Sequence, residues 1–469
     1  MSHVVATPHV VTASFQMGGD TASIATHDLE RGGTWYDACI VDDVALGAGW
    51  TDAILRATDV RLTVANRLDL GAPGAVYQYL RGSAVVNGLD VLIETITTVT
   101  WGDGSEQEFV EAKTLTCTGR EVRPGTVTLL LSDIEDQRLN ALYPPATYAA
   151  DVFAGLSPLD EGRPMPSVVG IAEKVPLARI TNASPWQYLA AKQCVPAAAT
   201  AVTITTVYRG SSPSDARVTT HDGLIASTTY RGVSFLADQR DFSGAEYRLY
   251  ADVTTADFTA PQIIRQLLTD AGVTVDTTSF SACEAWASAN GLLVDCDFGA
   301  WGQRTTRAIL EDLLYVSRAA LDRRDDGSYA IVYDGPATGW SDYDEDAGDP
   351  VELLSLTEPS APSKVGIRYR PSPRDPAGAL QFTILRTVPH GTHGEERPRE
   401  CRYVRRHDVA DKTAWYYAQR AAHAQRLRLR VYRTVHGLGD TLRITSAAWG
   451  LSASEWRVRR VTRIVGGVE

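Results

Sequence analysis

The 469-residue chain lacks the short motifs that mark the common enzyme classes. It has no G-x-x-x-x-G-K-[ST] loop to hold phosphates, no G-x-S-x-G nucleophile turn and no H-E-x-x-H zinc motif. No G-x-G-x-x-G follows a strand pattern, so no dinucleotide site is indicated either. The sequence therefore predicts no catalytic residues and no cofactor, and we expect the protein not to be an enzyme.

Cysteine is sparse and scattered. There are six cysteines and no C-x-x-C, which argues against a zinc ribbon or a thioredoxin-type pair. Even the closest two, Cys283 and Cys296, are 13 positions apart. We expect free, mostly buried thiols, as in a protein folded in a reducing cytoplasm. An iron–sulfur site assembled from distant cysteines stays open as an alternative.

The sequence also has no long apolar run and no net positive charge. No apolar run approaches the roughly 18 residues that span a bilayer, and the N-terminus has no signal-peptide pattern. We expect no membrane-spanning segment and synthesis in the cytoplasm. The net charge of −12 argues against a dedicated nucleic-acid binder. It is compatible with a channel through which DNA passes without being held.

The composition is that of a soluble globular protein with several domains. Hydrophobic residues make up 44% and charged residues 22% of the chain, and its length predicts about two to four domains. We predict an N-terminal β-rich barrel-like domain at 1–155, a Pro-rich connector with a small β domain at 156–250, an α+β domain at 251–345, and a C-terminal β-barrel domain with one Ala-rich helix at 346–469.

The first 140 residues are predicted to be mainly strands. Residues 91–101 are rich in β-branched side chains, and a second candidate strand returns at 108–118. Arg123-Pro124-Gly125 then turns the chain into a third strand at 126–131. This succession is typical of the meanders found in barrels and sandwiches.

Helices are predicted in the middle of the chain. Pro261 fits the first turn of a helix that Gly272 ends. A short helix follows at 283–289, and a third begins after a cap at Thr305 or Thr306. Its apolar residues lead into a hairpin of strands 319–323 and 329–333.

The later part of the chain mixes strands, loops and one helix. Residues 334–350 and 390–399 are predicted to be loops, and strands are expected at 364–369, 380–388, 440–445 and 456–465. Asp408 is predicted to cap a helix that runs to about Gln425. Its apolar stripe is predicted to contain Ala414, Trp415, Ala418, Ala421 and Ala422.

Two polar segments invite a metal hypothesis. Carboxylates alternate along 342–349, as in calcium loops, but the glycine comes one place late and the twelfth position is Leu353. His390, His393, Glu395 and Glu396 would need further ligands fixed by the fold. A solvated acidic loop and a flexible polar loop are the favoured interpretations.

Arginines concentrate at 397–433, in a chain that is acidic as a whole. This stretch has three interpretations. It could dock to an acidic partner subunit, it could face DNA, or it could be an ordinary surface that pairs with the protein's own acids.

Two segments resemble the hub proteins at the tail tip or baseplate of long-tailed bacteriophages. The first, 128–180, contains Leu131-Ser132-Asp133, Tyr143-Pro144-Pro145, Gly162-Arg163-Pro164-Met165-Pro166, Val169-Gly170 and Val175-Pro176. The second, 400–465, contains Arg402-Tyr403-Val404, the Ala-rich helix, Gly439-Asp440-Thr441-Leu442 and Trp456-Arg457-Val458. The helix and hairpin at 303–333 also fit the middle region of these proteins.

The resemblance implies a mainly β fold with α+β insertions: two tail-tube-like β-barrel domains plus smaller mixed domains. It implies a homotrimeric ring that joins the tail tube or distal tail ring to a central fibre or receptor-binding protein. Such a ring surrounds the path of the tape-measure protein and then of DNA. The expected location is the virion tail tip, after assembly in the host bacterial cytoplasm. The alternative is a virion-associated or secreted carbohydrate-active enzyme, or a glycan-binding module.

For the hub, the Pro-rich segment and the basic stretch are the candidate contacts with partners. The candidate interface residues are Tyr143, Pro144, Pro145, Arg163, Pro164, Pro166, Arg402, Arg405, Arg406 and Trp415.

Overall fold

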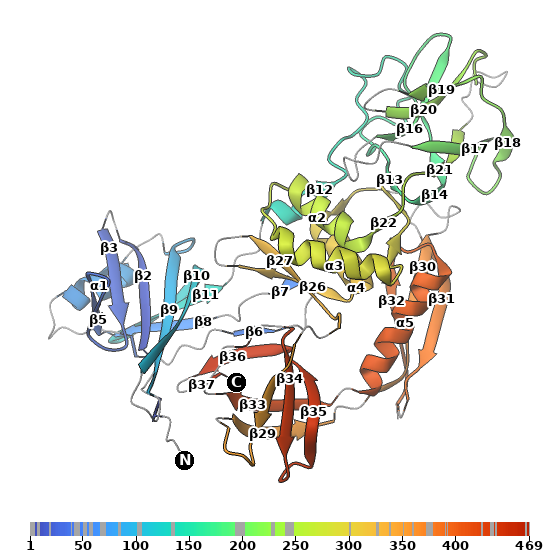
Figure 1. Cartoon of the computed structure of the whole chain (residues 1–469). Coiled ribbons are helices and arrows are strands. Elements are labelled where there is room, and N and C mark those ends of the chain that lie inside the picture. The colour runs from blue at the N-terminus through green and yellow to red at the C-terminus, as the bar shows by residue number, and fades with distance from the viewer. Residues whose placement is uncertain are drawn as a thin grey trace.

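The computed structural model places the chain in five structural parts, most of them built from strands (Figure 1). It describes all residues except 1–4, 7–9, 18–19, 39, 42–46, 50–53, 56–59, 66–71, 83–85, 101–105, 133–136, 193–201, 227–229, 240–247, 300–301, 325–327, 337–338, 350, 359–360, 372–378, 390, 392, 424, 432–435, 437–438, 465–466 and 469.

The N-terminal part is a nine-stranded half-barrel sheet with the order β4-β5-β3-β2-β9-β10-β11-β8 and β1 beside β9. The predicted meander is confirmed as β9 to β11, with Arg123 and Thr126 paired across the turn. Alternate residues of these strands point into one core, which helix α1 also covers. The elements are β1 (Val5–Ala6), β2 (Val10–Met17), β3 (Asp20–Ala25), β4 (Leu29–Arg31), β5 (Thr34–Ala38), β8 (Val60–Ala65), α1 (Ala72–Gly82), β9 (Asp90–Thr100), β10 (Glu106–Arg123) and β11 (Thr126–Ser132).

The middle part packs three helices against a small sheet. Helix α2 has Pro261 in its first turn as predicted, and Thr259 and Gln262 form a capping box before it. Thr305 caps α4 by accepting a hydrogen bond from the Ala308 N–H. The elements are η2 (Gln137–Asn140), β12 (Leu142–Tyr143), β22 (Phe258–Thr259), α2 (Ala260–Asp270), α3 (Thr277–Ala289), β23 (Leu293–Val294), β24 (Cys296–Phe298), β25 (Arg304–Thr305), α4 (Thr306–Ser317), β26 (Ala319–Arg323) and β27 (Tyr329–Tyr333).

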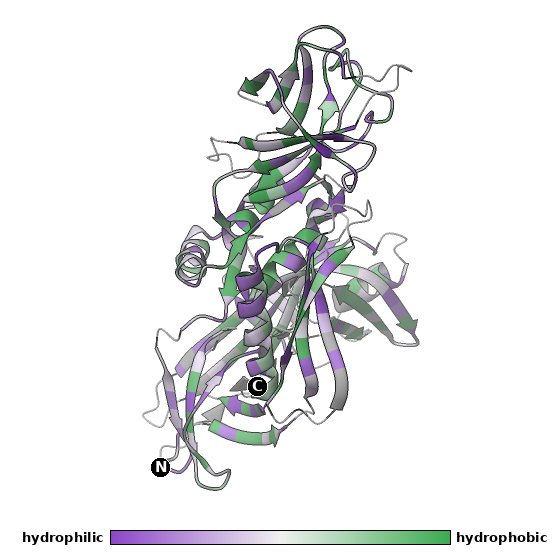
Figure 2. Cartoon of the chain, turned by 90° about the vertical axis from the view of Figure 1, so that its right-hand side faces the viewer, coloured by the Kyte–Doolittle hydropathy of each residue, from purple (hydrophilic) through white to green (hydrophobic). Residues whose placement is uncertain are grey.

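A β-sandwich of two four-stranded sheets interrupts this middle part. It projects from the rest of the chain as a separate lobe at the top of both views (Figures 1 and 2). Pro176 lies in β14, the edge strand next to β21 in the sheet order of the described residues, and an edge strand tolerates a missing N–H. The strands are β13 (Ser167–Val169), β14 (Ile171–Pro176), β15 (Ala178–Arg179), β16 (Trp186–Lys192), β17 (Thr203–Gly210), β18 (Arg217–Thr219), β19 (Gly223–Ala226), β20 (Tyr230–Phe235) and β21 (Arg248–Thr254), of which β13 pairs with β24 of the middle part.

Two further parts follow. One is a three-stranded sheet, β31-β30-β32, covered by helix α5, and the other is a C-terminal pair of sheets around a common core. The first contains β30 (Pro362–Pro371), β31 (Leu380–Thr387), β32 (His393–Cys401) and α5 (His407–Ala422). The second contains β28 (Ser341–Asp344), β29 (Val351–Thr357), β33 (Arg426–Val431), β34 (Thr441–Ser446), β35 (Leu451–Arg457), β36 (Arg460–Ile464) and β37 (Gly467–Val468).

Two short strands from the N-terminal region leave its sheet and join distant parts. Strand β6 (Gly47–Gly49) pairs antiparallel with β36, and β7 (Ile54–Leu55) pairs in parallel with β26. The excursion lies between Ile40 and Val64, which form a bridge in the N-terminal part. The chain thus ties its first part to the middle and C-terminal parts through backbone hydrogen bonds.

The predicted mainly β fold with helical insertions is confirmed, but several local predictions are wrong. Helix α1 lies in a region that was predicted to be mainly strands. Its buried residues Val76, Tyr77 and Leu80 share one helix face, although Val and Tyr favour strands by themselves. The helix predicted at 283–289 begins earlier, at Thr277, because Asp276 caps it.

Two segments predicted to be loops contain strands. Residues 341–344 form β28, parallel to β34, and residues 393–401 form β32, parallel to β30. Both sequences are polar, so pairing with a distant strand, rather than hydrophobic alternation, fixes them as strands. The 456–465 strand is interrupted, because β35 ends at Arg457 and β36 begins at Arg460.

The cap of α5 also differs from the prediction. The N-cap is Arg406, and Asp408 lies in the first turn, where a carboxylate still favours the positive end of the helix dipole. Trp415 is not part of the buried stripe: its side chain is 57% exposed. The residues that the helix buries are Val409, Ala410, Thr413, Ala414 and Ala418.

The thiol prediction is confirmed for Cys117, Cys283 and Cys401, which are free and buried. Burial raises the pKa of each of these thiols. Cys39 and Cys194 lie outside the described residues. Across the described part of the chain, no helix is both long and apolar enough to cross a bilayer.

Shortening a side chain in the middle core should destabilise the protein strongly. Leu313 in α4 is fully buried, so Leu313→Ala should lower the free energy of unfolding by about 2–5 kcal/mol through lost transfer energy and a cavity. Urea unfolding followed by tryptophan fluorescence measures this change. Val218 is 73% exposed, and Val218→Ala should change stability by no more than about 0.5 kcal/mol. Equal midpoints for the two variants would contradict the assignment of this core.

Candidate functional site at the junction of three parts

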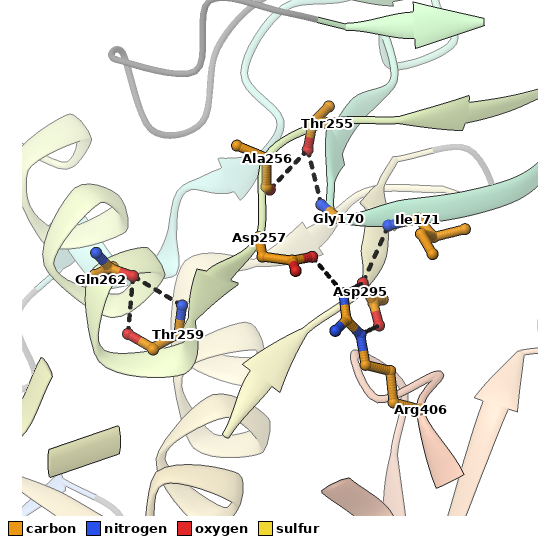
Figure 3. Close-up of polar contacts among 9 residues, drawn as sticks. All are labelled: Gly170, Ile171, Thr255, Ala256, Asp257, Thr259, Gln262, Asp295 and Arg406. Carbon is orange, nitrogen blue, oxygen red and sulfur yellow. Dashed lines mark hydrogen bonds and ion pairs between the residues drawn. The ribbon is translucent and has the colours of Figure 1, made fainter. Parts of the chain in front are cut away.

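A concentrated set of polar contacts between distant segments lies where the sandwich, the middle part and the α5 part meet (Figure 3). At its centre is Asp295, between β23 and β24, whose side chain is only 1% exposed. An acid within the mostly apolar segment Leu292–Phe298, which also contains Asp297, was the sequence signal for this position. A buried carboxylate is costly unless it is paired and hydrogen-bonded.

Both carboxylate oxygens of Asp295 are used. Arg406 donates from Nε to Oδ2 at 2.5 Å and from Nη2 to Oδ1 at 3.1 Å. The backbone N–H of Ile171, at the start of the sandwich, also donates to Oδ1 at 3.1 Å. Arg406 further pairs with Asp257, which precedes β22. The two carboxylates raise the pKa of Arg406, so it stays charged. One guanidinium therefore connects α5 to both chain segments of the middle part that adjoin the sandwich.

Gly170 makes the close approach of these segments possible. Its φ is +63°, and a Cβ atom there would lie 2.1 Å from Asp295 Oδ1. Its N–H donates to Thr255 Oγ1 at 2.8 Å, and its carbonyl accepts from the Thr255 N–H at 2.7 Å. These two bonds continue the pairing of β14 with β21 at the end of both strands that adjoins the middle part.

A second ion cluster lies beside the first. Arg370 Nη2 lies 2.9 and 3.0 Å from the two carboxylate oxygens of Glu173 in β14. Arg405 Nη1 is 3.6 Å from the same carboxylate. The Arg405 side chain is only 8% exposed, and its Nε and Nη1 have no hydrogen-bond partner among the described residues. The junction therefore holds three arginines and three carboxylates in close contact.

A partly buried acid, Asp334, plays a similar part between the middle part, the α5 part and the C-terminal sheets. It follows β27 and accepts hydrogen bonds from Arg459 Nη2 at 2.5 Å and from Tyr416. Arg457 Nε lies 3.2 Å away, and the same guanidinium donates to the carbonyl of Tyr333 at 3.1 Å. The carboxylate of Asp334 thus joins the middle part, helix α5 and the C-terminal sheets.

The ten candidate interface residues fall into different environments. Tyr143 is buried with its ring centroid 5.6 Å from that of Phe298, and Pro144 and Pro164 both lie against Gly299. Pro166 is buried, and its carbonyl accepts from the Lys192 N–H. Arg163 pairs with Asp160, and Arg402 lies 3.5 Å from Glu400. Arg405 and Arg406 lie in the junction, whereas Pro145 and Trp415 are exposed.

The acidic loop uses its carboxylates on its own backbone. Asp349 accepts from the Asp344 N–H at 2.7 Å, and Asp344 accepts from the Ala347 N–H at 3.0 Å. Asp346 accepts from the Ala447 N–H at 2.7 Å, which anchors the loop to the end of β34. Within the described residues, no group of three or more His, Cys, Asp or Glu side chains is placed to hold a metal ion, and His390 lies outside these residues.

No protein-family model and no curated protein matches the chain. Among solved structures it resembles the 43 kDa tail protein of prophage MuSo2 from Shewanella oneidensis, with 11% identity, a TM-score of 0.40 and coverage of 99% of this chain and 98% of that one. A chain from the virion of a native gene transfer agent particle aligns with 12% identity, a TM-score of 0.42 and coverage of 66% and 85%. Prophage tail protein gp18 from Listeria monocytogenes aligns with 8% identity, a TM-score of 0.37 and coverage of 98% and 94%. Two of these three solved structures are described as prophage tail proteins, the kind of protein that the two sequence segments resemble.

Adding one methyl group at Gly170 should disturb the junction. Both Gly170 and Gly162 have φ in the left-handed region, but only at Gly170 is the space for a Cβ occupied. We expect Gly162→Ala to cost about 1 kcal/mol of unfolding free energy, and Gly170→Ala about 2–5 kcal/mol, because a clash adds to the φ cost. Urea denaturation of both variants provides the comparison. Equal losses of unfolding free energy in the two variants would mean that the Asp295 side chain can move aside for the added methyl group, and would contradict this prediction.

Asp334 should make stability depend on pH in acid. Burial alone would raise its pKa, but Arg459, Tyr416 and Arg457 together hold the pKa below its ordinary value. The unfolded chain then binds protons more readily, so this stabilisation is present above the unfolded pKa of about 3.9 and is lost as pH falls through the folded pKa. Asp334→Asn should therefore be less stable than the native chain at pH 7, and the difference should shrink towards about pH 2.

Denaturation midpoints measured from pH 7 downwards give this comparison. Asp342, whose side chain is 70% exposed, supplies the control. Asp342→Asn should leave the pH dependence unchanged. A constant difference between the native chain and Asp334→Asn at every pH would refute the assignment.

Proposed function

We propose that the chain is a structural subunit of a phage tail tip or baseplate hub. Three copies would form a ring that joins the tail tube or distal tail ring to a central fibre or receptor-binding protein. The ring would surround the path of the tape-measure protein and the exiting DNA. Its role would be non-enzymatic, in the virion, and two sequence segments carry the resemblance to such hubs.

The observation that supports this proposal best is the link between the two ends of the chain. The N-terminal half-barrel and the C-terminal sheets each have a core of their own. Strand β6, from the N-terminal region, extends the C-terminal sheet by pairing with β36. A ring with two β domains from each subunit needs such a fixed relation between them within one chain.

Charge and exposure support the same role. With a net charge of −12, the surface would tend to repel DNA passing through the ring. Arg405 and Arg406 make their contacts within the chain, so we assign partner contacts to the exposed candidates Pro145 and Trp415. An exposed tryptophan is the kind of residue that contributes most to binding at interfaces.

Association in solution tests the proposal. Light scattering across a concentration series should give the mass of three chains, and negative-stain images of the same sample should show closed rings with a central opening. Obligate interfaces bury roughly 2,000 Å² or more. Because tryptophans contribute strongly to binding at interfaces, Trp415→Ser should raise the dissociation constant of the trimer about tenfold or more. Trp35, also 57% exposed, is the matched site, and Trp35→Ser should leave association unchanged.

A chain that stays monomeric both alone and with tail-tube protein rings would contradict the hub. Glycan binding or glycan cleavage by that monomer would instead support the carbohydrate-active alternative. Cleavage lost on replacing a single acid in 342–349 would favour the enzyme over the binding module.

A further inference from the structure

Strand β31 forms the outer edge of the sheet that α5 covers (Figure 1). Among the described residues it pairs with β30 alone, in a single antiparallel register from Leu380 to Thr387. The edge strands β14, β29, β32 and β35 differ, because an irregularity interrupts the pairing of each. Irregular pairing is one of the devices by which proteins keep a sheet edge from binding another strand. Strand β31 lacks this protection, and it contains no proline.

The backbone of β31 offers hydrogen bonds on its outer side. In an antiparallel pair, residues whose N–H and C=O bond to the partner strand alternate with residues whose backbone groups point away from it. The Val388 N–H, just after the strand, donates to the Ser363 carbonyl at 3.0 Å, in the register of the strand. The even-numbered residues of β31 therefore bond to β30. The backbone groups of Thr383, Leu385 and Thr387 point outward, and no described residue bonds to them.

The side of this edge that faces α5 is apolar. Phe382 is 45% exposed, and Ile384 packs partly against the core beneath the helix. Arg386 is the one charged residue of β31, and it pairs on this side with Asp411 of α5. A strand added beside β31 would place every second side chain next to Phe382 and Ile384. Apolar side chains fit there, because Arg386 already has its carboxylate.

The opposite side of the edge presents an arginine that has no carboxylate. Arg368 in β30 lies opposite Thr383, and its side chain is exposed. Arg386, Lys364 and Arg370 each meet an acid of this chain, whereas Arg368 forms no ion pair with a described residue. An added strand would lie two strand spacings from β30, roughly 10 Å away. Long arginine and glutamate side chains can meet across that distance above the short Thr383.

We propose that β31 receives an extended segment of a partner protein as an additional strand. The backbone of the segment would bond to the outward groups of β31. One row of its side chains is apolar and covers Phe382, and the other row contains an acidic residue that binds Arg368. Addition of a strand to an exposed sheet edge is a recurring mode of peptide recognition. The proposal goes beyond the proposed hub, and a failed ring assay would leave it standing.

Peptide selection on the full-length protein tests the proposal. A random decapeptide library supplies the probe, and the recovered peptides should alternate apolar residues with positions that include Asp or Glu. Fluorescence anisotropy then gives the dissociation constant of a recovered peptide. Thr383→Pro should raise this constant about tenfold or more, because it removes an outward N–H and leaves the bonds to β30 in place. The matched control Thr383→Val keeps the N–H and should bind like the native chain.

Site-resolved hydrogen exchange shows where the peptide binds. A saturating amount of peptide should slow exchange about tenfold or more at Thr383, Leu385 and Thr387, because their N–H groups become bonded. The amides of Phe382 and Ile384 already bond to β30 and should change little. Slowing confined to another strand would overturn the proposal. Equal slowing at all five amides would indicate a stabilised sheet without an added strand, and would overturn it too.

Two further variants keep the test decisive. Thr387→Pro removes another outward N–H near the end of the strand, and it should weaken binding even if Thr383→Pro does not fold. Arg368→Gln should raise the dissociation constant about threefold, and this difference should vanish in roughly 1 M salt. Peptides that bind the native chain and the proline variants equally would refute strand addition. Peptides without acidic residues, or a dimer of the chain that Thr383→Pro dissolves, would refute the proposed occupant.

Discussion

The arrangement of the parts depends on one buried charge. The Asp295 carboxylate is removed from water and is tolerated only because Arg406 and the Ile171 N–H supply its hydrogen bonds. Those two donors belong to different parts of the protein, so satisfying the carboxylate fixes where α5 and the sandwich lie. The requirement extends to Gly170, because any side chain there would occupy the space of the Asp295 oxygen.

Apolar burial gives stability within the parts and also joins α4 to the α5 part through Val316, and polar contacts between parts add orientation. The cores of the half-barrel, the sandwich and the C-terminal sheets are separate sets of buried side chains. Hydrophobic burial is non-directional and would allow many relative placements. Asp295 and Asp334 each draw donors from several parts, and β6 adds a backbone pairing. A hub subunit of the proposed kind would need this defined geometry.

Local signals predicted the elements that carry their own signature. Helix α2 has its cap and stop, and the hairpin of β26 and β27 has a turn between two apolar strands. The sequence did not predict elements that are stabilised by contacts with distant segments of the chain. Helix α1 has strand-favouring residues on its buried face, and β32 is a polar segment that becomes a strand by pairing with β30. Of the candidate interface, the basic stretch was recognised, but the acids that pair with it were not.

The sequence by itself determined the mainly β character, the middle helices and the free thiols, because hydrophobic periodicity, capping residues and cysteine spacing act over a few neighbouring positions. Only the tertiary structure decided that Arg406 meets an acid 111 residues away, that β6 extends a sheet made by the last strands, and that Trp415 remains exposed. Such contacts depend on how separate elements pack, and no local pattern records which distant charge or strand edge will be brought within bonding distance.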